Sequence, residues 1–249
     1  MESIFLPSDH FPESLGSIHI AHFHSLSNSA SLLDRLISAS KLDESHPDTA
    51  AERSALDFAF IDPTRLVSKQ HLVTACLQAI IAASRSNQAN RSAPHGTTLP
   101  VQGGMKTKTP HSEIIFALSP GNNIGESLKR FGLSSKSKSV VLVKICASSS
   151  TSEDSRGYGD RLATTDSILD SMISIIDGQL SLSPLEKTLD GVATHSETNW
   201  KEMSKIYKLN MPLLLSSSKG DGDGELAEKE RRRAIDIIVS AVAMKNVAA

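Results

Sequence analysis

The sequence predicts an α+β fold, in which a small central β-sheet packs against several helices within a single domain. Three observations predict it. Short apolar runs are typical of buried strands, longer segments repeat apolar residues every three to four positions as helices do, and Ser/Gly-rich stretches separate them. Because 39 % of the 249 residues are hydrophobic and only 4 % are aromatic, we expect one modest core with added inserts.

Three stretches combine Ser, Gly, Asn and charged residues without apolar periodicity, namely 84–104, 148–160 and 216–224. Such segments cannot bury enough apolar surface to order themselves. We interpret them as flexible, disordered inserts within one domain that spans residues 1–249. The alternative, that they link two domains, is weaker because the segments between them are short.

Sequence patterns in the first half of the chain predict one strand and two helices. Residues 17–23 are rich in β-branched and apolar side chains and predict the opening strand. In residues 31–39 the leucines and isoleucine share one helical stripe. Ser68 is placed to cap a longer helix, whose apolar residues follow a 3.6-residue period to position 81.

The middle of the chain predicts a strand, a short helix and a second strand. Residues 113–118 form a short apolar run that predicts a buried strand, ended by a Pro-Gly-Asn-Asn turn. Asn123 and Glu126 have the spacing of a capping pair, and Gly132 is placed to end that helix. Residues 140–145 then predict another buried strand.

Helical spacing of apolar residues recurs in three downstream segments, at 165–176, 198–209 and 225–245. The last of these places its apolar residues on one face and begins with a cluster of charged residues. Strands and helices are thus mixed along the chain, as the α+β prediction requires.

Charge and hydropathy exclude several classes of protein. The chain has 26 Lys plus Arg against 28 Asp plus Glu, a formal net charge of −2, so neither a basic nucleic-acid coat nor an acidic tail is indicated. No apolar run approaches the ~20 residues that cross a bilayer, and we expect no membrane contact. Cys76 and Cys146 lie within apolar runs, which predicts buried, reduced thiols.

No catalytic motif is found in the sequence. A Gly-x-Ser-x-Gly elbow, Walker A spacing and a Gly-x-Gly-x-x-Gly after a strand are all missing. We therefore predict that the protein is not an enzyme, has no catalytic residues and needs no cofactor.

Three histidines are the nearest approach to a metal site. His19, His22 and His24 fall near one predicted strand, where His22 and His24 share a face and His19 points to the other. Three ligands therefore do not converge without a bend, and ordinary strand-surface histidines are the favoured interpretation. Residues 221–225 imitate the start of a calcium loop but lack its later ligands. We predict no metal site.

One segment of the chain is distinctly basic. Between residues 105 and 145, seven basic and two acidic residues give +5, in a chain that is −2 overall. Clustered cations gain affinity for phosphates by releasing counterions. The alternative is a solvated basic face without a ligand. The four candidates that flank the central apolar run are Lys106, Lys108, Lys129 and Arg130.

The two C-terminal helical segments offer an apolar surface for a partner. An amphipathic helix can place such a stripe in a groove of another protein. The alternative is that the stripe is buried in the core of this chain. The candidate partner-binding residues are Ile206, Tyr207, Leu209, Ile235, Ile238 and Val239.

Residues 105–132 read MKTKTPHSEIIFALSPGNNIGESLKRFG. This segment resembles the central signature of the PRPK-binding (TPRKB-like) subunit of the KEOPS, or EKC, complex. Residues 60–68 are similar to the family's Asn-Pro stretch, with Asp62 in place of the usual Asn. Residues 180–182 and 206–209 resemble the later V-S-L and I-Y-K-L elements. The resemblance extends from about residue 18 to 246, interrupted by the inserts.

The resemblance implies a non-catalytic subunit of the nucleus and cytoplasm. Members of the family bind the kinase-like ATPase subunit directly and the other KEOPS/EKC subunits indirectly. The complex installs threonylcarbamoyl on the tRNA adenosine beside the anticodon, and tRNA contact at the 3′ CCA end is also implied. The alternative is a pure protein-interaction module, which stabilises or activates the kinase-like subunit without contacting RNA.

Overall fold

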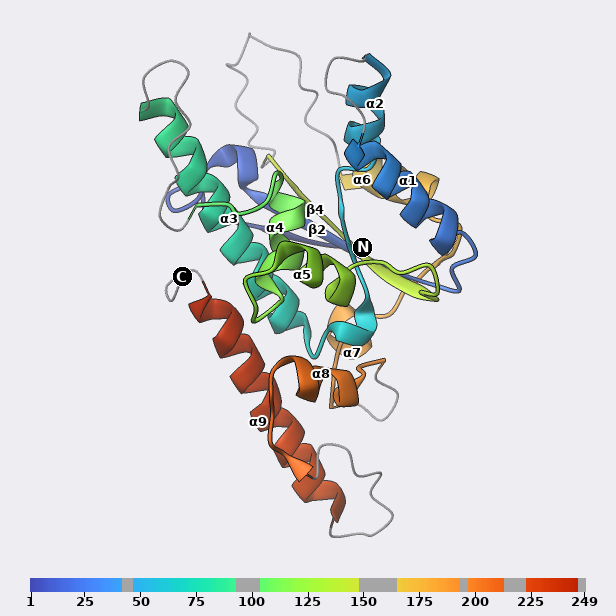
Figure 1. The fold of residues 1–249 in the computed structure, drawn as a ribbon, viewed down its shortest axis with the longest axis vertical. Helices are drawn as coiled ribbons and strands as arrows, with labels where there is room; N and C mark the ends of the chain where they lie inside the picture. The colour runs from blue at the N-terminus through green and yellow to red at the C-terminus, as the bar shows by residue number, and fades with distance from the viewer. Residues whose placement is uncertain (42–46, 93–103, 148–164, 193–196, 213–222, 246–249) are drawn as a thin grey trace. The chain divides into compact units, whose positions relative to one another are not determined.

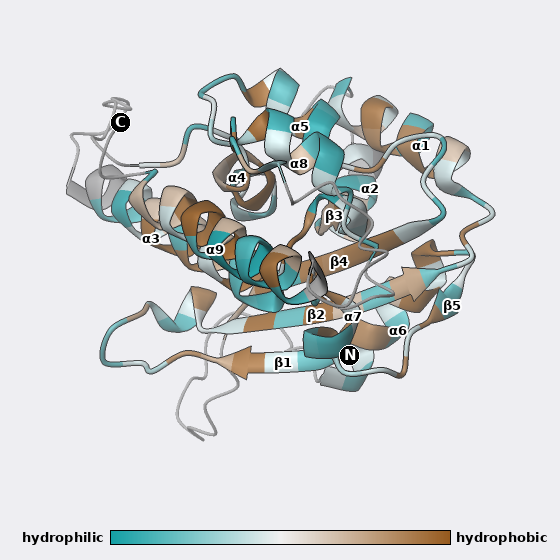
Figure 2. Cartoon of the chain, turned by 90° about the horizontal axis from the view of Figure 1, so that it is seen from below, coloured by the Kyte–Doolittle hydropathy of each residue, from teal (hydrophilic) through white to brown (hydrophobic). Residues whose placement is uncertain are grey.

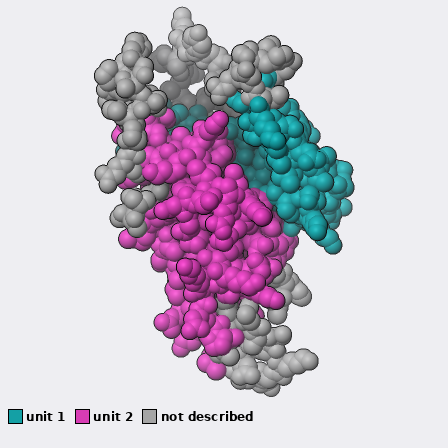
Figure 3. All heavy atoms as spheres, in the orientation of Figure 1, with its two compact units in different colours: residues 1–60, 133–182 teal, residues 61–132, 183–249 magenta. Residues whose placement is uncertain are grey.

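The computed structural model describes residues 1–41, 47–92, 104–147, 165–192, 197–212 and 223–245 (Figure 1). They fall into two compact units, coloured separately in Figure 3. Unit 1 consists of residues 1–60 and 133–182, and unit 2 of residues 61–132 and 183–249. The chain passes through each unit twice, so neither is a contiguous stretch. The single domain stays a prediction.

The β-sheet has the strand order β1-β2-β4-β3, and β5 also pairs with β2. The strand β2 is central and pairs antiparallel with β1, β4 and β5. The expected strands at 17–23 and 140–145 are confirmed as β2 and β4, and the α+β class is confirmed with them. The strands are β1 Glu2–Phe5, β2 Ser17–His24, β3 Ala59–Ile61, β4 Ser139–Cys146 and β5 Gln179–Leu180.

Two helices of unit 1, α1 and α6, pack on one face of the sheet. Alternate residues of β2 and β4, including Phe23 and Leu142, point to this face and join a buried cluster. Leu32 and Met172 from the helices complete it. The helices expected at 31–39 and 165–176 are confirmed. The helical elements of unit 1 are η1 Glu13–Leu15, α1 Ser29–Lys41, α2 Pro47–Ala55 and α6 Thr165–Ile175.

Helices make up the described part of unit 2, with α3 as its centre. This helix packs against both α4 and α9, and Figure 2 shows α3 and α9 side by side. Gln78 Nε2 donates a hydrogen bond to the carbonyl oxygen of Ala243 at 2.8 Å, which joins them. The elements are η2 Pro63–Arg65, α3 Lys69–Ser92, α4 Pro110–Ala117, α5 Ile124–Phe131, α7 Leu185–Thr188, α8 Trp200–Ile206 and α9 Asp223–Met244.

The strand expected at 113–118 is wrong, because this run belongs to helix α4. Thr109 caps the helix by accepting a hydrogen bond from the Ser112 amide, and Pro110 occupies the first turn, where its missing N–H costs nothing. A short apolar run has no period that separates a buried strand from a buried helix. The arrangement is therefore helix, helix, strand.

Several other boundaries follow the expected signals. Ser68 Oγ accepts from the His71 amide at 3.0 Å and begins α3. Asn123 accepts from the Glu126 amide at 3.0 Å and begins α5. Gly132 ends α5, where a Cβ would collide with the carbonyl oxygen of Leu128.

The expected inserts are only partly described. Helix α3 continues to residue 92, so residues 84–92 of the first expected insert are helical. Within this helix, Ser84 Oγ donates back to the Ile80 carbonyl at 2.8 Å. Residues 93–103, 148–160 and 216–222 lie outside the described part of the chain. No helix among the described residues is long and apolar enough to cross a membrane.

Candidate functional site

The signature segment folds within unit 2 as a loop, α4, a turn and α5. Glu113 is buried at the start of α4, and its Oε2 atom accepts three hydrogen bonds. The donors are the amides of Lys106 and Thr107, at 3.0 and 2.9 Å, and the Thr107 hydroxyl at 2.7 Å. One carboxylate thus fixes the loop that bears Lys106 and Lys108. Sequence reasoning counted Glu113 only as a negative charge.

Replacing Glu113 by glutamine is expected to lower the free energy of unfolding by about 2 kcal/mol, because a neutral amide accepts hydrogen bonds less strongly than a carboxylate. Urea unfolding of the full chain measures this. Glu126→Gln, on exposed α5, is the matched control and should cost less than about 1 kcal/mol. Equal losses in the two variants would contradict the role assigned to Glu113.

The turn between α4 and α5 is braced by Lys245, just beyond the last turn of α9. Its Nζ donates to the carbonyl oxygens of Phe116, Ser119 and Gly121, the last at 3.0 Å. Nζ also lies 3.6 Å from the centroid of the Phe116 ring. Burial lowers the pKa of Lys245 to about 8, so the ammonium form still predominates at pH 7. The C-terminal helix and the signature turn are therefore joined.

Tyr207, which follows α8, makes a second hydrogen bond that holds the end of α4. Its hydroxyl donates to the carbonyl oxygen of Leu118 at 2.5 Å. His71 Nε2 lies 3.2 Å from the same hydroxyl and must donate to it, since the hydroxyl proton is already used. Burial lowers the pKa of His71 to about 3 and raises that of Tyr207. His71 is therefore neutral at pH 7.

The basic candidates of the signature differ in their availability. Lys106, Lys108 and Lys129 are exposed. Arg130 instead forms an ion pair with Glu126 one turn earlier on α5. Elsewhere in the segment, Lys144 on β4 of unit 1 is committed to Asp57, with Nζ 2.8 Å from its Oδ2 atom. Two of the seven basic residues of the segment, Arg130 and Lys144, are thus paired with carboxylates of this chain.

The apolar stripe expected on α9 faces inward. Ile238 has no exposed surface and lies on the buried side with Ala234 and Val242, which contradicts its place among partner-binding residues. Ile235 and Val239 are half-buried at the border of that side. This chain buries the stripe within its own fold, because α9 packs on α3.

The preceding helix is also engaged internally. The Tyr207 hydroxyl is held by Leu118 and His71, while the residue as a whole is half-buried. Ile206 and Leu209 are half-buried. Their contact with a partner stays a prediction.

The outer face of α9 has apolar residues that sequence reasoning missed. Leu226, Ile237 and Met244 are 55 %, 41 % and 56 % exposed. They are 11 and 7 residues apart, close to three and two helical turns, so they form one stripe. Ile124 and Leu128 on α5 make a smaller exposed pair, at 36 % and 42 %. The spacing could have identified the stripe, but not which side faces outward.

The histidines of β2 do not form a metal site. His19 and His22 are buried on opposite faces of the sheet, so the expected surface location is wrong for both. His19 Nδ1 lies 2.8 Å from Ser3 Oγ, and burial lowers the pKa of His19. Among the described residues, no group of three His, Cys, Asp or Glu side chains could hold a metal ion. Cys76 is a buried free thiol, and Cys146 is half-buried and also free.

Comparison with known proteins gives one consistent result. Residues 23–246 match the family described as kinase binding protein CGI-121. The protein named EKC/KEOPS complex subunit CGI121 from Cryptococcus neoformans is 28 % identical, over 99 % of this chain and 100 % of its own length. The protein named EKC/KEOPS complex subunit cgi121 from Neurospora crassa is 30 % identical, over 77 % of this chain and 80 % of its own. The chain therefore belongs to the kinase binding protein CGI-121 family.

Proposed function

We propose that this protein is a non-catalytic subunit of a KEOPS/EKC complex, in the nucleus and cytoplasm. It binds the kinase-like ATPase of the complex and helps to position tRNA for threonylcarbamoylation of the adenosine beside the anticodon. The observation that supports this is the family match over residues 23–246, together with relatives named as KEOPS/EKC subunits. The signature segment 105–132 lies within that match.

The outer face of α9 is the proposed contact with the kinase-like subunit. Leu226, Ile237 and Met244 form a stripe about 27 Å long, which is long enough to cross an interface of ordinary size. Half-buried Ile206 and Leu209 of the α8 segment are secondary candidates. The smaller pair on α5, Ile124 and Leu128, spans only about 6 Å of helix and offers less apolar surface for an anchor.

Contact with tRNA is proposed for the exposed lysines of the signature segment. Lys106 and Lys108 precede α4, in the loop that Glu113 fixes, and Lys129 lies on α5. The ion pair between Arg130 and Glu126 favours the alternative, a protein-interaction module that does not touch RNA, because it neutralises the fourth candidate. The two functions predict different effects of these lysines on the salt dependence of tRNA affinity.

Changing Lys106, Lys108 and Lys129 together to glutamate separates the two functions. If these lysines meet phosphates, the slope of log affinity for tRNA against log salt should flatten by about 2.1 to 2.7, since each contact contributes about 0.7 to 0.9. The control changes Lys41, Lys187 and Lys229, three exposed lysines outside the basic segment, to glutamate. Unchanged tRNA affinity of the signature variant at low salt, with the kinase partner still bound, would favour the protein-interaction module.

A further inference from the structure

A second line of lysines lies on and just after helix α8, outside the signature segment. Lys201, Lys205 and Lys208 are all exposed and are spaced by four and three residues. Lys201 and Lys205 lie one turn apart on one face of α8, and Lys208 lies in the turn that ends the helix. None of the three was a candidate from the sequence.

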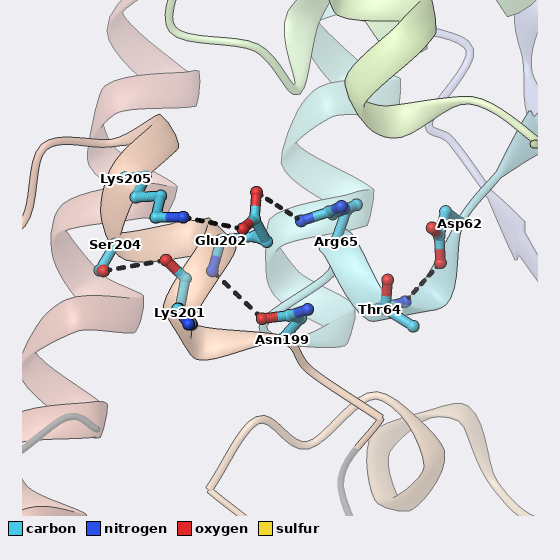
Figure 4. Close-up of polar contacts among 8 residues, drawn as sticks. All are labelled: Asp62, Thr64, Arg65, Asn199, Lys201, Glu202, Ser204 and Lys205. Atoms are coloured by element: carbon cyan, nitrogen blue, oxygen red, sulfur yellow. Dashed lines mark hydrogen bonds and ion pairs between the residues drawn. The ribbon is translucent and has the colours of Figure 1, made fainter. Parts of the chain in front are cut away.

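The charge of this face is not cancelled by its neighbours. Glu202 lies between Lys205 and Arg65, with its carboxylate 3.1 Å from Lys205 Nζ and 3.7 Å from Arg65 Nη1 (Figure 4). Three cations, Lys205, Arg65 and Lys201, act on this one carboxylate. The Arg65 Nε and Nη1 atoms are buried without a hydrogen-bond acceptor among the described residues. The cluster therefore retains positive charge, to which the buried Arg65 atoms contribute through the local field rather than by contact.

The position of Lys208 is informative because its backbone is strained. The residue has φ 53°, in the left-handed region that favours glycine. The motif ends α8: the Leu209 amide donates to the Ser204 carbonyl at 2.8 Å, and the Lys208 amide donates to the Lys205 carbonyl at 3.4 Å. Glycine would serve this turn better than lysine, so the fold gives no reason for the lysine side chain. Strain of this kind points to a function for the residue.

The face offers cations without a base-stacking platform. The ring of Trp200 is buried, and its Nε1 atom donates to the Gly191 carbonyl at 2.9 Å. Proteins that read single-stranded bases stack them on exposed aromatic rings, whereas phosphates need only cations and donors. The chemistry of this face suits a phosphate backbone.

We propose that the face formed by Lys201, Lys205, Lys208 and Arg65 is a binding site for the phosphate backbone of RNA, additional to the lysines of the signature segment. Lys201 and Lys208 contact successive phosphates, while Lys205 and Arg65 add to the local positive field. This inference rests on the proposed tRNA role, and it assigns a separate site to it. Recognition there is independent of base sequence and sensitive to salt.

The test is a salt titration with an unmodified tRNA transcript. In the full chain, Lys201→Gln with Lys208→Gln leaves the Glu202 ion pairs intact. The slope of log affinity against log salt should flatten by about 1.4 to 1.8 relative to the unmodified chain. The control, Lys187→Gln with Lys229→Gln, removes two other exposed lysines of unit 2 and should leave the slope unchanged. Equal slopes in all three proteins would overturn the site.

A single variant separates RNA binding from a structural role. Lys208→Gly should raise the melting temperature, because glycine relieves the left-handed backbone, and should still flatten the salt slope by about 0.7 to 0.9. Loss of kinase-subunit binding with normal tRNA binding would overturn the site and identify an acidic protein surface as its ligand. A chain that binds no tRNA, alone or within its complex, contradicts the proposed tRNA role as well as this site.

Discussion

Changing Ile237 and Met244 on α9 to glutamate is expected to lower affinity for the kinase-like subunit roughly a thousandfold. Both side chains are about half exposed on the outer face, so the chain alone tolerates the change. In the complex each substitution removes an apolar anchor and places a charge in the interface, at about 2 kcal/mol or thirtyfold per site. The dissociation constant of the purified pair measures the effect.

Helix α5 provides the matched control for this experiment. Ile124→Glu with Leu128→Glu changes another pair of exposed apolar residues in unit 2. This variant should bind the kinase-like subunit within a fewfold of the original affinity. If the α5 variant fails to bind and the α9 variant binds normally, α5 is the docking helix and the assignment to α9 is wrong.

Acidification is expected to destabilise the protein through His71. Its pKa is lowered from an ordinary value of 6.5 to about 3 by burial, so the unfolded chain takes up a proton that the folded chain excludes. The free energy of unfolding should therefore fall as pH decreases from about 6.5 towards 3, by up to about 1.4 kcal/mol per pH unit. Urea unfolding at pH 7, 5.5 and 4.5 measures this decline.

Glutamine at position 71 tests the origin of the decline. The amide group of His71→Gln can still donate to the Tyr207 hydroxyl but does not titrate, so the loss of stability between pH 6.5 and 4.5 should become shallower. His24→Gln, which changes a half-exposed histidine of unit 1, should retain the original slope. The same pH dependence in all three proteins would show that His71 is not responsible.

Elements with local signals were predicted well from the sequence. Helix α5 lies between its N-cap Asn123 and its C-cap Gly132, and each of these residues acts within one turn of the helix. The strand expected at 113–118 failed, because a fully buried apolar run has no exposed face to reveal its period. The cap at Thr109 and packing on α3 favour a helix over a strand for α4.

The candidate site could be predicted only in part, because its contacts join residues far apart in the chain. Lys245 reaches the carbonyl oxygen of Gly121, 124 positions earlier, and Tyr207 reaches that of Leu118, 89 positions earlier. No local pattern marks such pairs. Periodicity found an apolar stripe on α9 but could not say that Ile238 faces α3 while Ile237 faces outward.

The most direct measurement is co-purification of the full chain with the kinase-like ATPase of its own cell, followed by determination of mass and dissociation constant. We expect a one-to-one complex of the two proteins that survives gel filtration and is lost when Ile237 and Met244 are changed to glutamate. Separate elution of the two unmodified proteins at micromolar concentration would contradict the function proposed for this chain.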